Sequence, residues 1–225
     1  MDQAVHSAKR RASARKRPEP TRTNDPARTM ADILEVATRE FADKGLAGAR
    51  IDVIAEAMRT SKRMIYYYFG SKEGLYLAVL EESYRRVRGV ELELNLQDLE
   101  PEDALRRLVA FTFDHHLHHE NYIRLVMSEN INRGQFVAQS QRIQDLNVPA
   151  IAAIRNLYER GVKAGTFRKG LDPVDIHASI SALSFFNVSN RHTFGTIFKL
   201  DMLSPSYIAQ RRANVTEMVV RFVRK

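Results

Sequence analysis

The sequence predicts an all-α fold. From Thr29 to the C-terminus, apolar residues recur at spacings of three and four residues, which is the period of a helix with one buried face. The 225 residues include only 10 glycines and 7 prolines, and these punctuate the periodic segments. No series of segments shows the polar–apolar alternation of β-strands. We therefore expect helices packed on helices, in a short N-terminal unit followed by a larger C-terminal one.

Residues 1–27 form a polar, basic segment before the first periodic stretch. Pro18, Pro20 and Pro26 interrupt it, and its composition buries too little apolar surface for folding, so we expect a disordered arm. Residues 1–28 carry eight basic and three acidic side chains, so +5 of the net charge of +8 lies there. The densest basic cluster consists of Lys9, Arg10, Arg11, Arg15, Lys16 and Arg17. This cluster is either a solvated tail or an arm that follows the phosphates of a nucleic acid.

Three helices and the start of a fourth are expected next. Two apolar stripes define the first two helices: Met30, Ile33, Leu34, Ala37 and Phe41, then Ile51, Ile54, Ala55 and Met58. Gly45 is placed to cap the end of the first helix. The third helix runs from Lys62 to Phe69, and Ser71 is expected to cap the start of the fourth.

The rest of the chain is also expected to be helical. An acidic linker around Glu91–Leu99 has a strand-like pattern, and Pro101 suits the first position of a fifth helix. Further helices are expected near residues 121–131, 135–162, 173–194 and 205–223.

The second and third helices are separated only by Arg59, Thr60 and Ser61. So short a turn between two brief amphipathic helices is typical of a helix-turn-helix, whose second helix enters a major groove of DNA. At about 100° per residue, Ile65 and Phe69 point toward the core with Tyr68 beside them, so we expect Tyr68 to pack against the first helix.

The opposite face of the third helix carries residue types that suit DNA. Arg63 and Tyr67 point outward, and Met64 and Tyr66 flank them. An arginine can bind guanine through two hydrogen bonds, and a tyrosine offers a hydroxyl to phosphate and a ring to thymine methyl groups. Lys62 begins this helix, and Lys72 opens the fourth helix, whose N-terminus suits a phosphate.

The run IAEAMRTSKRMIYYYFGSKEGLYLAVL, residues 54–80, resembles the signature of the TetR family of transcriptional regulators. In that signature an I-A-x-x-A-G-V-S helix-turn leads without gaps into L-Y-x-x-F-x-S-K-E-x-L. The matching residues are Ile54, Ala55, Ala57, Ser61, Tyr66, Phe69, Ser71, Lys72, Glu73 and Leu75. The resemblance covers the DNA-binding segment in detail and the remaining chain only in outline.

The sequence departs from this signature at three positions. Arg59 replaces the turn glycine, so a residue with a Cβ is expected at positive φ. Thr60 replaces the usual valine, and Ala49 replaces the usual hydroxyl residue at the start of the second helix, where Arg50 offers a charge instead. The resemblance and the outward face together predict a DNA-binding set: Arg50, Ser61, Lys62, Arg63, Met64, Tyr66, Tyr67 and Lys72.

The resemblance implies a helix-turn-helix DNA-binding domain at residues 28–75 and a helical ligand-sensing and dimerisation domain at residues 76–225. It further implies a homodimer that binds a palindromic double-stranded DNA operator, most simply as a repressor that a small-molecule effector releases. The segment 29–75 carries seven basic and seven acidic residues, so DNA affinity is expected to rest on local placement and on the basic arm.

The helices at 173–194 and 205–223 are candidates for the dimer interface. The first is apolar or small on both faces, so both faces must be covered. The second has one stripe, formed by Ile208, Val215, Val219 and Phe222. Two such helices from each subunit would make a four-helix interface, and the alternative is burial within one protomer.

The run FTFDHHLHHE at 111–120 brings histidines into an apolar stripe. Thr112, His116 and His119 continue the face formed by Leu105 and Leu108. Such histidines are hydrogen-bonded core residues or a polar patch in a ligand cavity. The alternative function is a helical ligand- or metal-binding protein in which DNA binding is secondary, because His115 and His119 have the i, i+4 spacing that can place two imidazoles on one ion. The candidate ligand-binding residues are Thr112, His115, His116, His119, Asn130, Arg133, Phe186, Asn187 and Asn190.

Other functions are not expected. The chain has no cysteine, hence no disulfide or thiolate site, and no apolar run long enough to span a membrane. We find no phosphate loop, activated nucleophile or carboxylate pair, so neither an enzyme nor a cofactor is predicted. The basic N-terminus lacks the apolar stretch of a secretory signal, which favours a cytoplasmic location over an Arg-rich targeting segment.

Overall fold

The computed structural model describes residues 25–225, so the predicted basic arm lies almost wholly outside the described residues. The arm was expected to reach residue 27, but α1 (Pro26–Gly48) already begins at Pro26. The Asp25 carboxylate accepts hydrogen bonds from the backbone nitrogens of Ala27 and Arg28, at 3.0 and 3.3 Å. This cap and a proline at the first helical position explain the earlier start.

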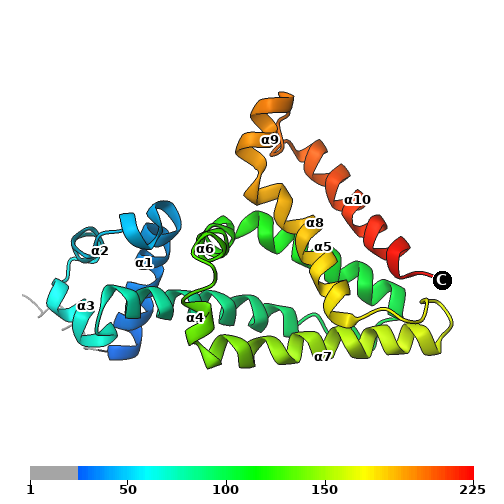
Figure 1. The fold of residues 1–225 in the computed structure, drawn as a ribbon, viewed down its shortest axis with the longest axis horizontal. Helices are drawn as coiled ribbons and strands as arrows, with labels where there is room; N and C mark the ends of the chain where they lie inside the picture. Colours follow the sequence, from blue (N-terminus) through cyan, green and yellow to red (C-terminus); the bar gives the residue numbers. More distant parts are fainter. Residues whose placement is uncertain (1–24) are drawn as a thin grey trace, which may run out of the picture.

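The described residues form an all-α fold, as predicted, without named strands (Figure 1). After α1, the elements are α2 (Ile51–Ala57), α3 (Lys62–Phe69), α4 (Lys72–Leu92), η1 (Leu96–Asp98), α5 (Pro101–His118), α6 (Glu120–Ile131), η2 (Val137–Gln139), α7 (Gln141–Lys163), α8 (Pro173–Ser189), α9 (Arg191–Phe198) and α10 (Pro205–Val223). None of the helices between residues 25 and 225 combines the length and apolar composition needed to cross a membrane.

The N-terminal unit packs α1, α2 and α3 against the first half of α4. Ile33, Phe41, Ile54, Ile65 and Leu75 are fully buried in its core, as their spacing predicted. Gly45 has φ +65°, which breaks the helical backbone near the end of α1. This core is completed from outside the unit by three apolar residues of the later chain: Leu125, Phe136 and Ile143.

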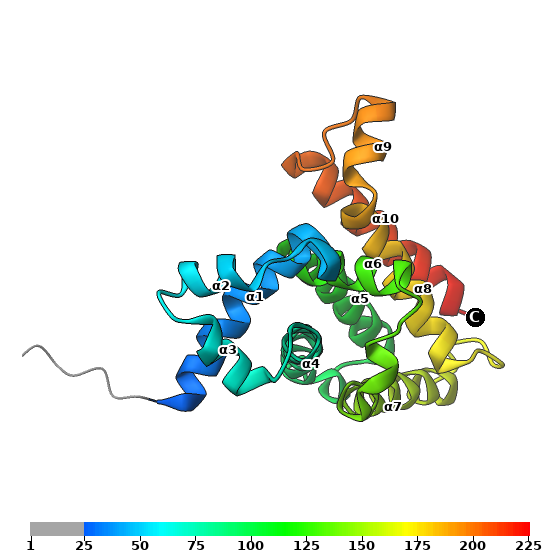
Figure 2. The same ribbon diagram turned by 60° about the vertical axis from the view of Figure 1, so that its left-hand side comes forward.

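Helix α4 is a single 21-residue rod that joins the two halves of the molecule (Figure 2). Its start is capped as predicted, because the Ser71 hydroxyl accepts from the backbone nitrogen of Gly74 at 2.9 Å. The expected domain boundary at residues 75/76 falls inside this helix. The prediction of a strand-like linker at Glu91–Leu99 was wrong, because α4 continues to Leu92 and η1 follows it.

The C-terminal body surrounds a second core formed by α5, α7, α8 and α10. Pro101 occupies the first turn of α5, as predicted. The helix expected from residue 135 instead begins at Gln141, where the Ser140 hydroxyl accepts from the backbone nitrogen of Ile143 at 3.1 Å. Before it, the buried Glu129 carboxylate accepts from the backbone nitrogens of Phe136 and Val137, both at 3.1 Å, which fixes a turn in place of helix.

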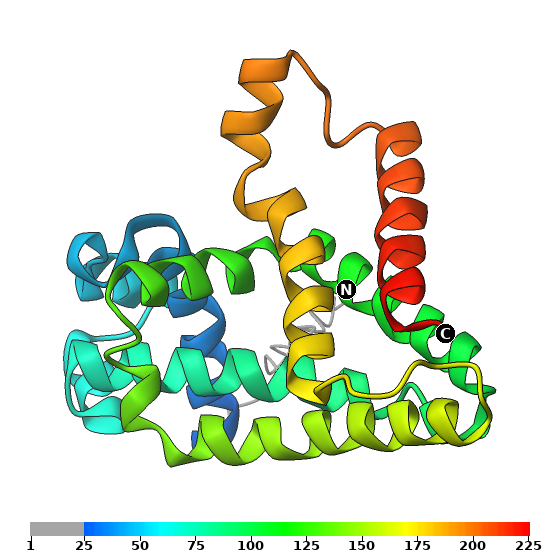
Figure 3. The same cartoon turned by 45° about the vertical axis from the view of Figure 1, so that its right-hand side comes forward.

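Helices α8, α9 and α10 rise from the body, with α9 at the far end (Figure 3). The helix expected at 173–194 is divided at Asn190. This residue has φ −108° and ψ 2°, which is not helical, and it separates α8 from α9. Val215 and Val219, from the predicted stripe on the last helix, are buried in the protomer's own core. The large apolar side chains that remain exposed between residues 173 and 223 are Val174, Ile197, Phe198, Leu200, Leu203 and Met218.

Candidate nucleic-acid interface and interior cavity

The turn between α2 and α3 has the geometry of a helix-turn-helix. Arg59 adopts φ +52°, the left-handed conformation expected where the signature has glycine. The backbone nitrogen of Thr60 donates to the Ala55 carbonyl at 2.9 Å, which closes the turn. The Ser61 hydroxyl then caps α3 by accepting from the backbone nitrogen of Met64 at 3.3 Å. The turn therefore holds α3 at a fixed angle to α2 despite its unusual residues.

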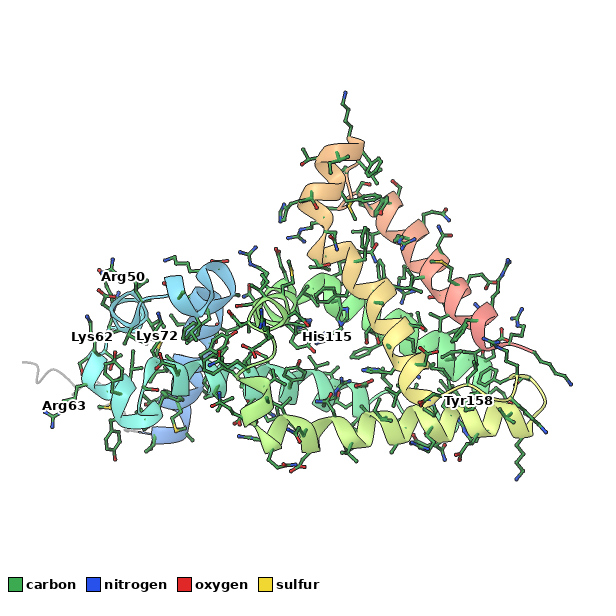
Figure 4. The ribbon with its side chains drawn as sticks, in the orientation of Figure 1. Arg50, Lys62, Arg63, Lys72, His115 and Tyr158 are labelled. Carbon is green, nitrogen blue, oxygen red and sulfur yellow. The ribbon has the colours of Figure 1, made fainter. Side chains whose placement is uncertain are left out.

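Helix α3 buries one face and presents the other to solvent. Ile65 is fully buried, whereas Tyr67 is 79% exposed and Tyr66 43% exposed. Arg63 is exposed and extends away from the rest of the protein (Figure 4). Tyr68 is half-buried against the N-terminal core, and its ring meets that of Tyr67 edge-on, with centroids 5.2 Å apart. The outward face thus combines a guanidinium with two tyrosine rings.

A shared carboxylate links two of the cations near this face. Asp52 pairs with Arg50 at 2.6 Å and with Lys62 at 3.8 Å. The hydrogen bond from Arg50 is the main cause that lowers the pKa of Asp52 to about 2. The sequence-based reasoning missed Asp52, although its position two residues after Arg50 was a visible signal. Lys72 is half-buried, and its ammonium donates to the Ala47 carbonyl at 3.3 Å, at the end of α1.

An interior cavity of about 490 Å³, partly open to solvent, lies between α4, α5, α6, α7 and α8. Three of the predicted ligand-binding residues line it: Thr112, His115 and His116. The other lining residues are Tyr84, Val87, Arg88, Glu91, Phe111, Tyr122, Val126, Val137, Ile143, Gln144, Asn147, His177, Ser181 and Phe185. Arg88 and Glu91 also line an apolar groove between α4 and α7, so this pair forms the partition between the two hollows.

His115 and His116 are buried side by side in the cavity wall. Burial, aided by charge repulsion from neighbouring histidines and Arg88, lowers the pKa of each imidazole to about 4. The Nδ1 atoms of both rings are enclosed without a hydrogen-bond partner. Both side chains are therefore neutral imidazoles near pH 7. Because their Nδ1 atoms have no partner, they are not the hydrogen-bonded core histidines that were one of the two predictions from the sequence.

The remaining predicted ligand-binding residues do not line this cavity. Asn130 and Arg133 are exposed where α6 ends, and neither is among the residues that line the cavity. Because α8 ends at Ser189, Phe186 turns to pack on Phe194 of α9, at 5.3 Å between ring centroids. Asn187 is buried, and its side-chain oxygen accepts from the Arg211 guanidinium at 3.1 Å, while the side-chain amide of Asn190 donates to the Ser189 hydroxyl at 2.8 Å.

His119 is also outside the cavity, since α5 ends at His118. Its ring stacks on His115 with centroids 4.1 Å apart, and its Nδ1 faces the His115 carbonyl at 2.9 Å. Stacked rings do not converge their nitrogens on one ion. Among residues 25–225, no group of three or more His, Asp or Glu side chains is arranged to hold a metal.

The sequence-based reasoning missed the wall that α4 contributes. Tyr84, Arg88 and Glu91 recur at i, i+4 and i+7, which places them on one helical face toward the cavity. That spacing was readable, but the interpretation of residues 91–99 as a linker cut the stripe short. Tyr122 and His177 complete the polar wall from α6 and α8.

One arginine of α6 connects the cavity-bearing body to the N-terminal unit. The Arg124 guanidinium donates to the backbone carbonyls of Ala42 and Asp43, at 2.8 and 3.3 Å, near the end of α1. These carbonyls lie before the break at Gly45. The helix that follows the histidine run is thereby tied to the first helix of the unit that presents α3.

An exposed recognition face on a short helix-turn-helix, joined to a larger helical body with an interior cavity, defines a class of DNA-binding regulators. The family model described as "Bacterial regulatory proteins, tetR family" matches residues 33–79, and that described as "Tetracyclin repressor-like, C-terminal domain" matches residues 101–219. The chain belongs to the TetR family of transcriptional regulators, which are generally not enzymes.

Individual relatives agree with this assignment. The chain is 33% identical over 198 residues to the HTH-type transcriptional repressor NicS of Pseudomonas putida, covering 88% of this chain and 93% of that protein. It is 35% identical over 140 residues to the repressor SCO4008 of Streptomyces coelicolor, covering 61% and 69%. The structure of Streptomyces coelicolor SCO4942 is similar at a TM-score of 0.65 and 28% identity, covering 87% and 98%.

Proposed function

We propose that this protein is a homodimeric repressor that binds a near-palindromic operator and is released by a small-molecule effector. The observation that carries the DNA-binding part is the outward face of α3, where Arg63 and Tyr67 are exposed while Ile65 anchors the helix. The DNA-contacting set is the one predicted from sequence, with Arg63 and Tyr67 at base edges. Arg50, Lys62 and Lys72 contact phosphates, so Arg50 and Lys62 exchange Asp52 for the backbone of DNA.

The exposed apolar residues of the α8–α9–α10 projection support a dimer. Val174 and Met218 are 52% and 40% exposed, and Ile197 of α9 is 70% exposed. Large apolar side chains that stay in contact with solvent in one protomer are available to a contact with a second copy. Two subunits joined there would set two copies of α3 about 34–36 Å apart, one helical turn of DNA.

The cavity is the proposed effector site, with Thr112, His115 and His116 in its wall. An effector there would contact α4 and α5 directly. It would favour a conformation with a different spacing of the two α3 helices and thereby weaken DNA binding by population shift.

A fluorescence anisotropy titration of the full chain with DNA from upstream of its own gene tests the DNA-binding part. We expect salt-sensitive binding that exceeds binding to a scrambled fragment. Arg63→Ala should weaken this preference, and the matched control is Arg39→Ala, because Arg39 is an exposed arginine of α1 that pairs with Glu35 at 3.4 Å. If the protein is a folded dimer but binds the upstream and the scrambled fragments with equal affinity, the proposal is refuted. Sedimentation velocity checks the dimer.

A further inference from the structure

The charges of the interior cavity cancel within its own wall. Of the residues that line it, Arg88 is the cation and Glu91 is the carboxylate, and the two form an ion pair. Both side chains are 11% exposed, and the Arg88 Nε atom donates to the Asn147 side-chain oxygen at 2.9 Å. The three histidines of the wall have lowered pKa values, so they add no charge near pH 7. A charged guest would therefore meet no unpaired opposite charge and would lose its hydration.

Ring side chains supply much of the remaining wall. Tyr84 and Tyr122 meet edge to face with centroids 5.6 Å apart, and Phe111 lies 5.7 Å from His115. Phe185 approaches His116 edge-on at 6.4 Å. Such pairs leave ring faces and edges as the contact surface for a guest, which a planar aromatic molecule fills better than a puckered aliphatic one.

The polar atoms left free define what the guest must carry. The Nδ1 atoms of His115 and His116 are enclosed, and among the described residues neither ring makes a hydrogen bond. A neutral imidazole with its proton on Nε2 avoids an enclosed, unpaired N–H, so two N–H donors remain for a guest. Glu91 adds an acceptor at the partition. The wall therefore suits a carbonyl oxygen beside an N–H or O–H donor.

We propose that the effector is an uncharged, planar aromatic molecule that carries an amide-like carbonyl, and that the Arg88–Glu91 pair is the element that rejects charged analogues. This inference rests on the proposed role of the cavity as the effector site. It assigns the carbonyl to the histidines and the ring to the space between Tyr122 and Phe185. Glu91 determines specificity by compensating Arg88, and it contributes no bond-making chemistry.

Four probes of matched size test the proposal by calorimetry on the full chain: benzamide, benzoate, benzamidine and cyclohexanecarboxamide. Benzamide should bind at least roughly tenfold more tightly than the two charged probes, because a charge in a neutral, desolvated site is penalised. It should also bind more tightly than the non-aromatic amide. Tighter binding of benzoate or of cyclohexanecarboxamide, or no binding of any of the four at millimolar concentration, would overturn the proposal.

A variant that removes the Glu91 charge separates a change of specificity from a general loss of binding. Glu91→Gln leaves Arg88 uncompensated, so preference should move from benzamide to benzoate, while Glu93→Gln, an exposed position two residues along, should leave the preference unchanged. If Glu91→Gln keeps the original preference, the pair does not select the guest. In the same way, Phe185→Ala should weaken benzamide binding and Phe186→Ala should not, because Phe186 packs on Phe194.

The two proposals fail separately. If the protein binds its upstream DNA but prefers benzoate, the ligand class is wrong and the regulator stands. If benzamide binds with the expected preference but no specific DNA binding is found, the repressor is wrong and the cavity chemistry stands.

Discussion

Lowering the pH from 7 to 5 is expected to destabilise this protein through His115 and His116. Each imidazole has a pKa of about 4 in the folded protein, below the ordinary 6.5. The unfolded chain therefore binds protons first, and stability is lost as the pH falls from about 6.5 to about 4. An imidazole whose pKa is 6.5 in the unfolded chain and about 4 in the folded protein lowers the free energy of unfolding by about 2 kcal/mol at pH 5. The two histidines together therefore lower it by about 3–4 kcal/mol relative to pH 7.

Urea denaturation followed by far-ultraviolet circular dichroism measures this loss, since the chain has no tryptophan to report by fluorescence. The double variant His115→Gln/His116→Gln should lose far less free energy of unfolding between pH 7 and pH 5 than the wild type. The control His118→Gln removes an exposed histidine of the same helix and should retain the wild-type loss. The single variant His116→Gln gives half the effect if the double variant does not fold. Equal pH dependence in wild type and double variant would refute the reasoning.

Three further experiments have defined outcomes. Arg63→Ala should cost about 1–3 kcal/mol at one base pair of the operator, measured by anisotropy on single-base operator variants; an equal loss on every sequence would make Arg63 a phosphate contact. Arg59→Val should lower the free energy of unfolding by about 1–2 kcal/mol, because a β-branched residue resists φ +52°, while Arg59→Gly should not lower it. Urea titration measures both values, and an unchanged stability of Arg59→Val would contradict the argument from backbone strain. Gly161→Ala should lower the free energy of unfolding by about 1–3 kcal/mol or more, because the added Cβ would lie 1.9 Å from the Phe167 ring. Gly89→Ala has open space around the added Cβ and should stabilise α4 by about 0.5–1 kcal/mol. The melting temperatures of the two variants should therefore move in opposite directions, and a shift in the same direction would refute the packing argument.

The helix-turn-helix was predictable because its signals are local. The apolar spacing that buries Ile54 and Ile65 is read within a few residues, and so is the serine that caps α4. The positive φ of Arg59 could likewise be expected from the signature. Only Asp52 was overlooked at this face, because its role depends on the side chains it meets.

The cavity was predictable only in part because it is a tertiary feature. Thr112, His115 and His116 share one helix, so their spacing placed them together. His177 comes from α8, and no spacing along the chain relates it to Tyr84 of α4. The pattern Glu91–Leu94 alternates polar and apolar residues like a strand, yet helical hydrogen bonding continues through Leu92 because α4 packs against α7. Tertiary packing overrides a weak local pattern of this kind.

The N-terminal core borrows Leu125, Phe136 and Ile143 from the body, and this has a consequence for protein engineering. A fragment cut after α4 would expose the apolar surfaces that these three side chains cover, at a cost of several kcal/mol in a unit of few helices. A chimera that transplants only the DNA-reading segment onto another sensor would inherit the same gap. The interchangeable part of this regulator is therefore the segment 25–92 together with complementary residues at 125, 136 and 143.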